Sequence, residues 1–125
     1  EIALSYAKDR LQFKRPIASC QLIQKELSDM VSRIVKAKLL NVHLARLKDK
    51  GMLFHHMISL AKMSNAKDAL HIAREARNIL GANGISLEYQ VIRHMTNLET
   101  VFTYEGTDNI HHLVVGKHIT GIDAF

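Results

Sequence analysis

The sequence contains few residues that cross-link or break a chain: it has no tryptophan, one cysteine and one proline among 125 residues. The single cysteine, Cys20, excludes an internal disulfide and suits a reducing compartment. We interpret Cys20 as a small core or interface residue and not as a nucleophile, because no base is evident beside it. With only one proline and six glycines, helix is the default structure over most of the chain.

Long apolar runs and dense clusters of one charge are also absent. No stretch approaches the roughly 18 apolar residues of a membrane span, so we expect none. The net charge is +5, but the basic residues are scattered and few aromatic residues lie between them. Nucleic-acid binding needs a basic stripe with aromatics, so we expect no nucleic-acid partner. The densest basic group, within residues 8–15, fits the mouth of a site for a phosphate-bearing ligand.

Apolar residues recur at steps of three and four over most of the chain, which predicts amphipathic helices. Pro16 disfavours helix for the residue before it, so residues 13–17 are predicted to interrupt the pattern. Helices are expected over residues 1–12, 19–50, 52–80, 88–98 and 108–120. Long helices with short connections, in one domain of 125 residues, predict an all-α fold: an up-down antiparallel helical bundle.

The two long helices each carry a stripe of apolar residues that is expected to be buried. The stripe of residues 19–50 contains Leu22, Ile23, Leu27, Met30, Val31, Ile34, Ala37, Leu40, Leu44 and Leu47. The stripe of residues 52–80 contains Met57, Leu60, Ala61, Ala69, Leu70, Ala73, Ala76 and Leu80. Its many alanines allow a neighbouring helix to approach closely.

Glycines and capping residues mark the ends of the predicted helices. Gly51 is expected to end the first long helix, and the "GANG" stretch (residues 81–84) forms a stop followed by a tight turn. Thr107 or Asp108 is expected to cap the last helix by accepting hydrogen bonds from its first amides. No capping residue precedes the first helix, so the chain is expected to begin inside a helix that starts upstream.

Eight histidines suggest a metal site, but their spacing does not support one. His111 and His112 are adjacent, as are His55 and His56, so each pair points about 100° apart on a helix. Asp108 and His112 share a helix face without an identifiable third ligand. We interpret these histidines as residues of solvated helix faces and expect no metal.

Three segments carry residues that suit chemistry: "DRLQFKRP" (residues 9–16), "RNILGANGI" (77–85) and "TYEGT" (103–107). The last places Glu105 just before a helix N-terminus, where the helix dipole favours a negative charge. A carboxylate that works as a base near neutral pH also needs an apolar, water-poor pocket that raises its pKa. Each segment alone is also typical of an ordinary turn. The order and spacing of the three segments together are a more specific sign of a functional site than any one of them.

Four motifs together resemble the C-terminal helical domain of flavin-dependent acyl-CoA dehydrogenases over essentially all 125 residues. They are "YAKDRLQFKRPIASCQLIQKELSDM", "AREARNILGANGIS", "EYQVIRH" and "TYEGTDNIHHLVVGKHITGIDAF". The stretch "VIRHMTNLETVFTYEGT" and the ending "HITGIDAF" resemble the glutaryl-CoA dehydrogenase branch of that family more narrowly. Many other members have an Arg-Asp pair in place of Thr96 and Asn97.

The resemblance implies that Glu105 is the catalytic base, which removes the α-proton of an acyl-CoA thioester while the β-hydrogen leaves as hydride to a flavin. The backbone amide of Glu105 would help to hold the thioester carbonyl. Gly106 would leave space beside the substrate, and Tyr104 would line its pocket. In the glutaryl branch the reaction is an oxidative decarboxylation of glutaryl-CoA to crotonyl-CoA.

The resemblance also implies FAD as cofactor. Arg10, Gln12 and Phe13 match positions that meet the FAD phosphates and adenosine of a neighbouring subunit, and Gln21 matches a further position on that side. Thr107 and Asn109 match flavin-contacting positions after the base. Three residues depart from the common family pattern: Lys14, Asn78 and Ala82 stand where many members have glycine, glutamine and glycine.

Family members place an N-terminal helical domain and a middle β-domain before this bundle, so residues 1–125 are expected to be the C-terminal domain of a longer enzyme. By itself the chain is expected to bind FAD poorly and to show no turnover. The resemblance implies a homotetramer, electron-transfer flavoprotein as the electron acceptor, and the bacterial cytoplasm or the mitochondrial matrix as location. Two alternatives stay open: a dehydrogenase for another short-chain acyl-CoA, and a non-catalytic helical module for assembly.

Overall fold

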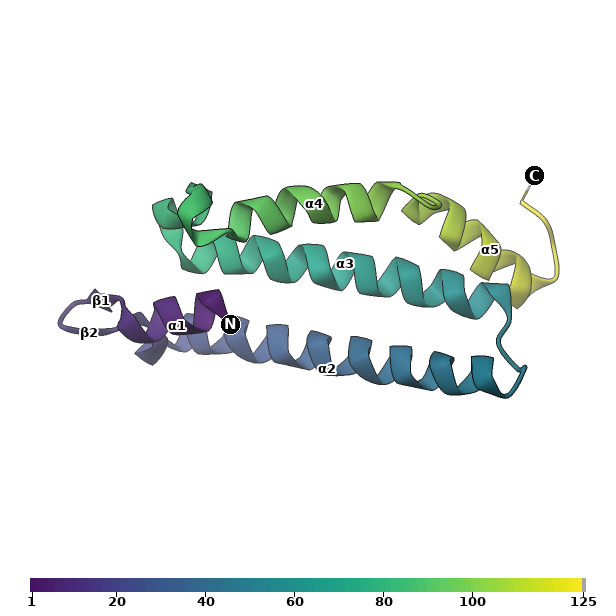
Figure 1. Ribbon diagram of the computed structural model, residues 1–125, viewed down its shortest axis with the longest axis horizontal. Helices are drawn as coiled ribbons and strands as arrows, with labels where there is room; N and C mark the ends of the chain where they lie inside the picture. The colour runs from purple at the N-terminus through teal and green to yellow at the C-terminus, as the bar shows by residue number, and fades with distance from the viewer. Residues whose placement is uncertain (125) are drawn as a thin grey trace.

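A computed structural model describes residues 1–124, and this part of the chain has the predicted all-α fold (Figure 1). Its helices are α1 (Ile2–Asp9), α2 (Gln21–Asp49), α3 (His55–Ile79), α4 (Val91–Thr103) and α5 (Asp108–Thr120). The short 3-10 turns are η1 (Ile17–Ser19), η2 (Gly81–Ile85) and η3 (Leu87–Tyr89). A small antiparallel hairpin, β1 (Leu11–Gln12) and β2 (Arg15–Pro16), follows α1.

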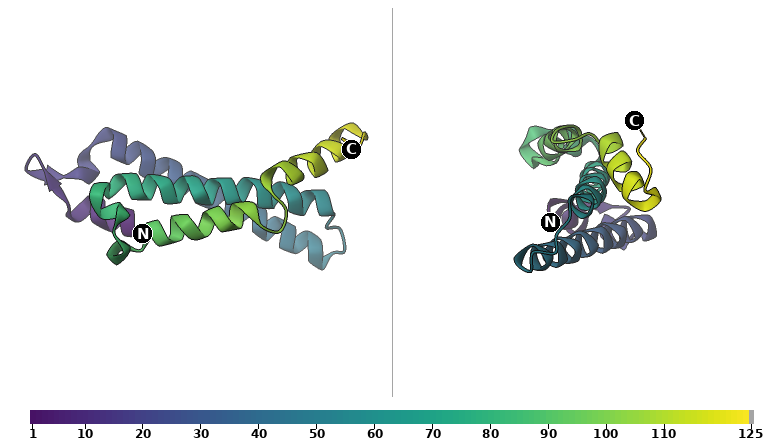
Figure 2. Two further views of the ribbon diagram at one scale, coloured as in Figure 1. Left: turned by 90° about the horizontal axis from the view of Figure 1, so that it is seen from above. Right: turned by 90° about the vertical axis from the view of Figure 1, so that its right-hand side faces the viewer.

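Helix α3 is the centre of the bundle. It packs against α2 on one side and against α4 and α5 on the other, as the end-on view shows (Figure 2). Helices α2, α3 and α4 alternate in direction, as the predicted up-down bundle requires, and α5 continues onward from α4 along α3 (Figure 1). The C-terminus therefore lies far from the hairpin, which protrudes from the other end of the molecule, whereas the N-terminus is one short helix, α1, away from it.

The buried core concentrates where α1, the start of α2 and the end of α3 meet. It consists of Ala3, Ala7, Ile17, Met30, Ile79, Leu80 and Val91. Further along α3, small residues at Ala61, Ala66 and Ala73 are buried beside its neighbours. Burial of apolar side chains contributes about 25 cal/mol per Å², so this cluster fixes the hairpin end of the bundle.

The predicted apolar stripe of α2 is only partly covered, which corrects the sequence-based expectation for some of its members. Met30 is buried, Leu22, Val31 and Ile34 are 75%, 59% and 38% exposed, and the other six are half-buried. On α3, Leu60 is also exposed instead of buried. The reason is the topology: α2 packs mainly against α3 and η1, so within residues 1–124 the side of the stripe that faces away from α3 stays exposed.

Helix boundaries differ from the prediction mainly near turns. α1 ends at Asp9 and not at the predicted residue 12, because residues 11–16 form a hairpin where the sequence suggested the end of a helix and an interruption. α3 begins at His55, three residues later than expected, and α4 extends to Thr103, five residues further than expected. At the end of α2, Gly51 has φ +67°, which agrees with its predicted role as terminator.

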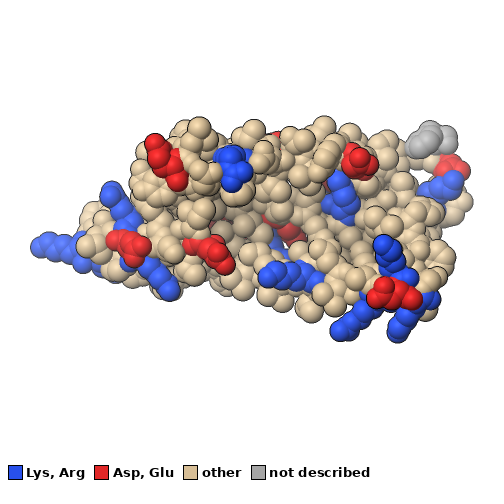
Figure 3. Space-filling model, viewed as in Figure 1, with Lys and Arg blue, Asp and Glu red and all other residues tan. Residues whose placement is uncertain are grey.

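The surface carries both charges without a continuous basic stripe on the face drawn in Figure 3, where acidic and basic side chains alternate over the helices. In the described part of the chain, every helix is too short or too polar to cross a membrane.

Candidate functional site

The turn between α4 and α5 presents Glu105. Helix α4 ends at Thr103, Tyr104 takes an extended conformation, and Glu105 has φ +54°. A non-glycine residue in this left-handed region costs roughly 1–2 kcal/mol, so other contacts must hold the turn. Gly106 follows with φ +96°, a conformation that suits glycine because it has no Cβ. The predicted base is therefore displayed on a constrained turn and not on a regular helix.

Two side chains from other parts of the chain contact this turn. The Lys62 ammonium on α3 donates hydrogen bonds to the carbonyl oxygens of Gly106, at 2.8 Å, and Phe102, at 3.4 Å. On another side, the His111 ring packs against Gly106 so closely that a Cβ there would lie 3.0 Å from its Cε1 and Nε2 atoms. Gly106 is thus required both by its backbone conformation and by the space that His111 occupies.

Glu105 and Tyr104 are exposed within residues 1–124, with Tyr104 at 53%. A carboxylate in water keeps its hydration, whereas a base for a carbon acid works best where water is excluded. The chain described here supplies the position of Glu105, and the apolar cover that such a base needs has to come from atoms outside residues 1–124.

Thr107 caps α5, as predicted, since its hydroxyl accepts a hydrogen bond from the Ile110 amide at 3.4 Å. Asn109 lies exposed in the first turn of α5. The Asp108 carboxylate lies 3.0 Å from Nζ of Lys67 on α3 and 3.4 Å from Nε2 of His112, one turn further along α5. The predicted flavin-contacting residues Thr107 and Asn109 therefore stand beside Glu105 at a helix N-terminus, where backbone N–H groups are available to an acceptor.

The hairpin after α1 positions the second group of predicted site residues. Gln12 pairs with Arg15, and the two residues between them, Phe13 and Lys14, have φ of 51° and 64°. This two-residue turn projects Phe13, which is 84% exposed. Arg10 ends α1 and forms no ion pair within residues 1–124, so its guanidinium is free to bind an anion there. Gln21 lies exposed at the start of α2.

Arg10 and Gln12 share an open pocket of about 350 Å³ with the "GANG" turn. The pocket is lined by Tyr6, Arg10, Gln12, Ile17, Asn78, Ile79, Leu80, Gly81, Ala82 and Asn83. Asn83 donates to the Tyr6 hydroxyl at 3.1 Å, and Gly84 is buried against the Arg77 carbonyl. The tight turn thus brings backbone to the pocket wall beside the arginine, an arrangement that suits a phosphate.

The two groups of residues lie at opposite ends of α3. Lys62 marks the end near Glu105, and Ile79 lines the pocket of Arg10. On a helix these residues are about 25 Å apart, at 1.5 Å per residue. The structure therefore does not bring Arg10, Gln12 and Phe13 to Glu105 within one chain.

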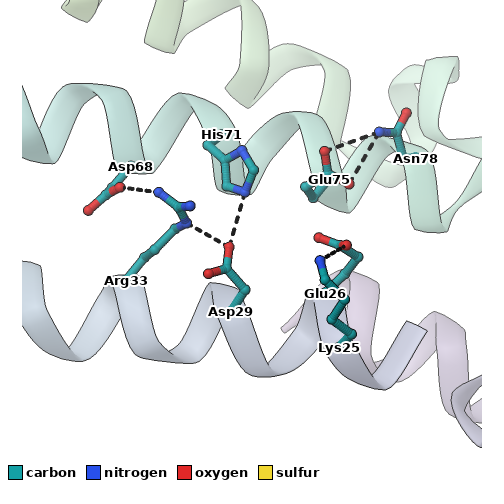
Figure 4. A network of polar contacts seen from close by, with 8 residues as sticks. All are labelled: Lys25, Glu26, Asp29, Arg33, Asp68, His71, Glu75 and Asn78. Atoms are coloured by element: carbon teal, nitrogen blue, oxygen red, sulfur yellow. Dashed lines mark hydrogen bonds and ion pairs between the residues drawn. The ribbon is translucent and has the colours of Figure 1, made fainter. Parts of the chain in front are cut away.

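The group in the described chain with metal-ligand spacing is Glu26, Asp29 and His71, whose ligand atoms lie within 4.8 Å of one another. Figure 4 shows that cations already bind its carboxylates: Lys25 pairs with Glu26 at 2.7 Å, and Arg33 with Asp29 at 2.7 Å. The hydrogen bond from Arg33 lowers the pKa of Asp29, with help from His71. These contacts form an ion-pair network between α2 and α3.

The sequence-based reading missed two residues of the site region. Lys62 was not singled out, because a lysine on an alanine-rich helix carries no signal for a contact 44 residues away. His111 was expected on a solvated helix face but is only 8% exposed, which corrects that prediction. Helix α5 turns this face toward α3 and the Gly106 turn, an orientation that adjacent histidines in a sequence do not reveal.

A comparison with protein families matches residues 1–120 to the model described as "Acyl-CoA dehydrogenase, C-terminal domain". The chain belongs to the acyl-CoA dehydrogenase family. The human mitochondrial short-chain specific acyl-CoA dehydrogenase is 34% identical over 119 residues, which are 95% of this chain and 29% of that protein.

Solved structures of family members give the same result. A glutaryl-CoA dehydrogenase from Mycobacterium smegmatis is 50% identical, with a TM-score of 0.97 over 99% of this chain and 32% of that one. A second glutaryl-CoA dehydrogenase structure from this organism, in complex with FADH2, is 44% identical, with a TM-score of 0.96 over the same shares of the two chains. The chain thus spans about a third of the length of the acyl-CoA dehydrogenases that it matches.

Proposed function

We propose that residues 1–125 are the C-terminal helical domain of an FAD-dependent acyl-CoA dehydrogenase, in which Glu105 removes the α-proton of an acyl-CoA thioester. The observation that carries this proposal is the turn of Glu105. A strained residue at φ +54°, followed by a glycine with φ +96°, displays a carboxylate beside a helix N-terminus. Strain of this kind persists where the surrounding structure holds it, and it concentrates at functional sites.

Glu105 accepts the α-proton in this mechanism, and the Glu105 amide donates to the thioester carbonyl, where negative charge develops. Tyr104 lines the acyl pocket, and Gly106 keeps the space beside it open. Bound FAD supplies the acceptor for the hydride that leaves the β-carbon. Because the carboxylate is exposed within residues 1–124, closure of the site by the rest of the enzyme and by substrate would exclude water from it.

The residues present fit FAD at two places. Arg10 has no ion-pair partner in the described chain and stands in an open pocket with Gln12, so it can bind a phosphate with paired donors. Phe13 projects apolar surface that suits contact with a nucleoside, and Gln21 lies on the same side. Thr107 and Asn109 would meet the flavin beside Glu105. The distance between the two places favours one FAD shared by two subunits.

For the substrate we propose glutaryl-CoA, which would lose its α-proton to Glu105 and its β-hydrogen as hydride to FAD. Breaking of the bond to the distal carboxylate would then release carbon dioxide, and a proton taken up at the carbon that carried it would give crotonyl-CoA. Support comes from the identity of 50% with the glutaryl-CoA dehydrogenase from Mycobacterium smegmatis. The second candidate is another short-chain acyl-CoA, favoured by the relation to the human short-chain specific enzyme. We expect the residues that would bind the distal carboxylate of glutaryl-CoA to lie outside both the Glu105 turn and the hairpin pocket of Arg10.

The resemblance to acyl-CoA dehydrogenases supports the rest of the proposed enzyme. Reduced flavin has to be reoxidised, and we propose electron-transfer flavoprotein as the acceptor. A homotetramer would bring a hairpin to a neighbouring active site and would cover the apolar side of α2. The relatives come from a bacterium and from mitochondria, so we propose the bacterial cytoplasm or the mitochondrial matrix as location.

The test uses the full-length protein that contains this chain. It is mixed anaerobically with glutaryl-CoA while flavin bleaching and carbon dioxide release are followed, with Glu105→Gln beside it. We expect both signals in the parent and bleaching slowed by roughly 10²- to 10⁴-fold in the variant, which lacks the general base. Bleaching only with monoacyl thioesters would favour the second candidate. Absence of bleaching with every acyl-CoA would leave a non-catalytic assembly module.

A further inference from the structure

The Lys62 side chain on α3 has no carboxylate partner within residues 1–124. Its half-buried ammonium instead donates to two backbone carbonyls, Gly106 at 2.8 Å and Phe102 at 3.4 Å. Most lysines extend into water, where the charge is hydrated. A lysine that gives up part of its hydration for main-chain oxygens 40 and 44 residues away fixes the backbone that carries those oxygens.

The two carbonyls lie on either side of Glu105. The Phe102 oxygen belongs to the last turn of α4, where carbonyls lack helical partners and the helix dipole is negative. The Gly106 oxygen belongs to the peptide between Gly106 and Thr107, one residue after Glu105. A single ammonium with three donors therefore joins the end of α4 to the far side of the turn, and the two carbonyls bracket the segment that carries the proposed base.

The opposite side of the turn is held by packing. The His111 ring is buried and contacts Gly106, and both of its nitrogens lack a hydrogen-bond partner within residues 1–124. His111 therefore acts on the turn by its volume, while Lys62 acts by directed bonds. Hydrogen bonds within α4 and α5 end at either side of the turn, and in the described chain the Lys62 bonds are the polar contacts that reach it from another helix and oppose relaxation of Glu105 from φ +54°.

We propose that Lys62 is a positioning residue for Glu105. By binding the carbonyls of Phe102 and Gly106, it fixes the turn so that the Glu105 carboxylate and the Glu105 amide face the same thioester. This inference rests on the proposed function of Glu105 as base. A shift of about 1 Å in a reacting group can reduce a rate on the order of 10²-fold, so a contact that leaves substrate untouched can still control the chemical step.

The experiment uses the full-length protein with Lys62→Met, which keeps the length and apolar part of the side chain and removes the donors. Arg74→Met is the matched control, because Arg74 also lies on α3 and pairs with Glu99 on α4 but does not contact the turn. Lys62→Arg restores a cation with several donors, and Lys62→Gln is a second neutral variant in case the methionine variant does not retain flavin.

The first readout separates binding from chemistry. We expect Lys62→Met to slow anaerobic flavin bleaching at saturating acyl-CoA by roughly 10²-fold, with the substrate dissociation constant and the flavin content close to wild type. Lys62→Arg should recover part of the rate, and Arg74→Met should bleach like wild type. Equal losses in binding, flavin content and rate would indicate a merely structural lysine, and a wild-type rate in Lys62→Met would also overturn the proposal.

The second readout does not depend on activity. Amide hydrogen exchange of the peptide covering residues 102–107 should become faster in Lys62→Met and stay unchanged in Arg74→Met. Unchanged exchange in Lys62→Met would overturn the proposal. If none of the acyl-CoA substrates bleaches the flavin of the parent protein, the proposed function fails, and the catalytic part of this inference fails with it. The exchange measurement then still decides whether Lys62 holds the turn.

Discussion

Arg33 on α2 donates from Nη1 to the Asp68 carboxylate on α3 at 2.6 Å, and its Nε donates to Asp29 on its own helix at 2.7 Å. One guanidinium therefore joins the two long helices near their middle (Figure 4). Part of the apolar stripe of α2 is exposed within residues 1–124, so this polar contact contributes to the α2–α3 pairing beside the apolar packing.

Asp68→Asn tests this contact. The variant keeps the size of the side chain but removes the charge that faces Arg33 across the helix pair. We expect a loss of about 0.5 kcal/mol in the free energy of unfolding, as is usual for partly exposed ion pairs, measured by urea denaturation followed by circular dichroism. Lys25→Gln is the control, since Lys25 pairs only with its neighbour Glu26 and links no helices. An equal loss in the control would show that general surface charge, not the α2–α3 contact, is responsible.

The His56 ring stacks on the His118 ring with a centroid separation of 3.4 Å, and this contact should make the α3–α5 packing sensitive to pH. Partial burial lowers the pKa of His56, and the neighbouring His118 and His55 lower it further. The unfolded chain, with a pKa near 6.5, then binds more protons than the folded chain as pH falls. The contribution of neutral His56 to stability is therefore fully present above about pH 7. It is lost as pH falls through the unfolded-state pKa of about 6.5 toward the lower pKa of the folded state.

His56→Phe should remove this loss while keeping an aromatic ring in the stack. The urea midpoint of the wild type is expected to fall between about pH 7 and pH 5, and the midpoint of His56→Phe should fall less over the same interval. His94→Phe, at an exposed position on α4, serves as the control. Parallel curves for wild type and His56→Phe would contradict the prediction.

Gly84 and Gly116 should respond to alanine in opposite directions. At Gly84 a Cβ would collide with the backbone carbonyl of Arg77, which cannot move without displacing the end of α3. We expect Gly84→Ala to cost about 3 kcal/mol or more. Gly116 lies within α5 with open space around its Cβ position, so Gly116→Ala should stabilise the chain by about 0.5–1 kcal/mol through helix propensity. Thermal unfolding of the two variants measures both changes in stability. A destabilised Gly116→Ala would show that another group packs against this face of α5.

Arg10→Lys tests the proposed phosphate contact at the hairpin pocket. Lysine keeps the charge but loses the planar fork that binds two oxygens at once, so FAD should bind the full-length protein more weakly by roughly tenfold. The measurement is the FAD dissociation constant from flavin fluorescence, with Arg15→Lys on β2 as the control. Unchanged affinity in Arg10→Lys would place the phosphates elsewhere.

The sequence predicted the helices, their order and the turn of Glu105 from local signals. Regular apolar spacing, Gly51 after α2 and Thr107 before α5 each express a preference of a few neighbouring residues, and such preferences are visible without a fold. The hairpin was missed for a local reason as well, because Phe13 and Lys14 in a two-residue turn replace the asparagine and glycine that usually signal one.

The tertiary structure alone decided which faces are covered and which distant residues meet. Val31 and Leu60 lie at helical spacing in their stripes, yet both stay exposed, because burial depends on where the neighbouring helix lies. His111 became buried and Lys62 reached the carbonyls of Phe102 and Gly106 for the same reason. Periodicity specifies the face of one helix, whereas contacts over some 40 residues depend on the packing of three helices, which no local pattern encodes.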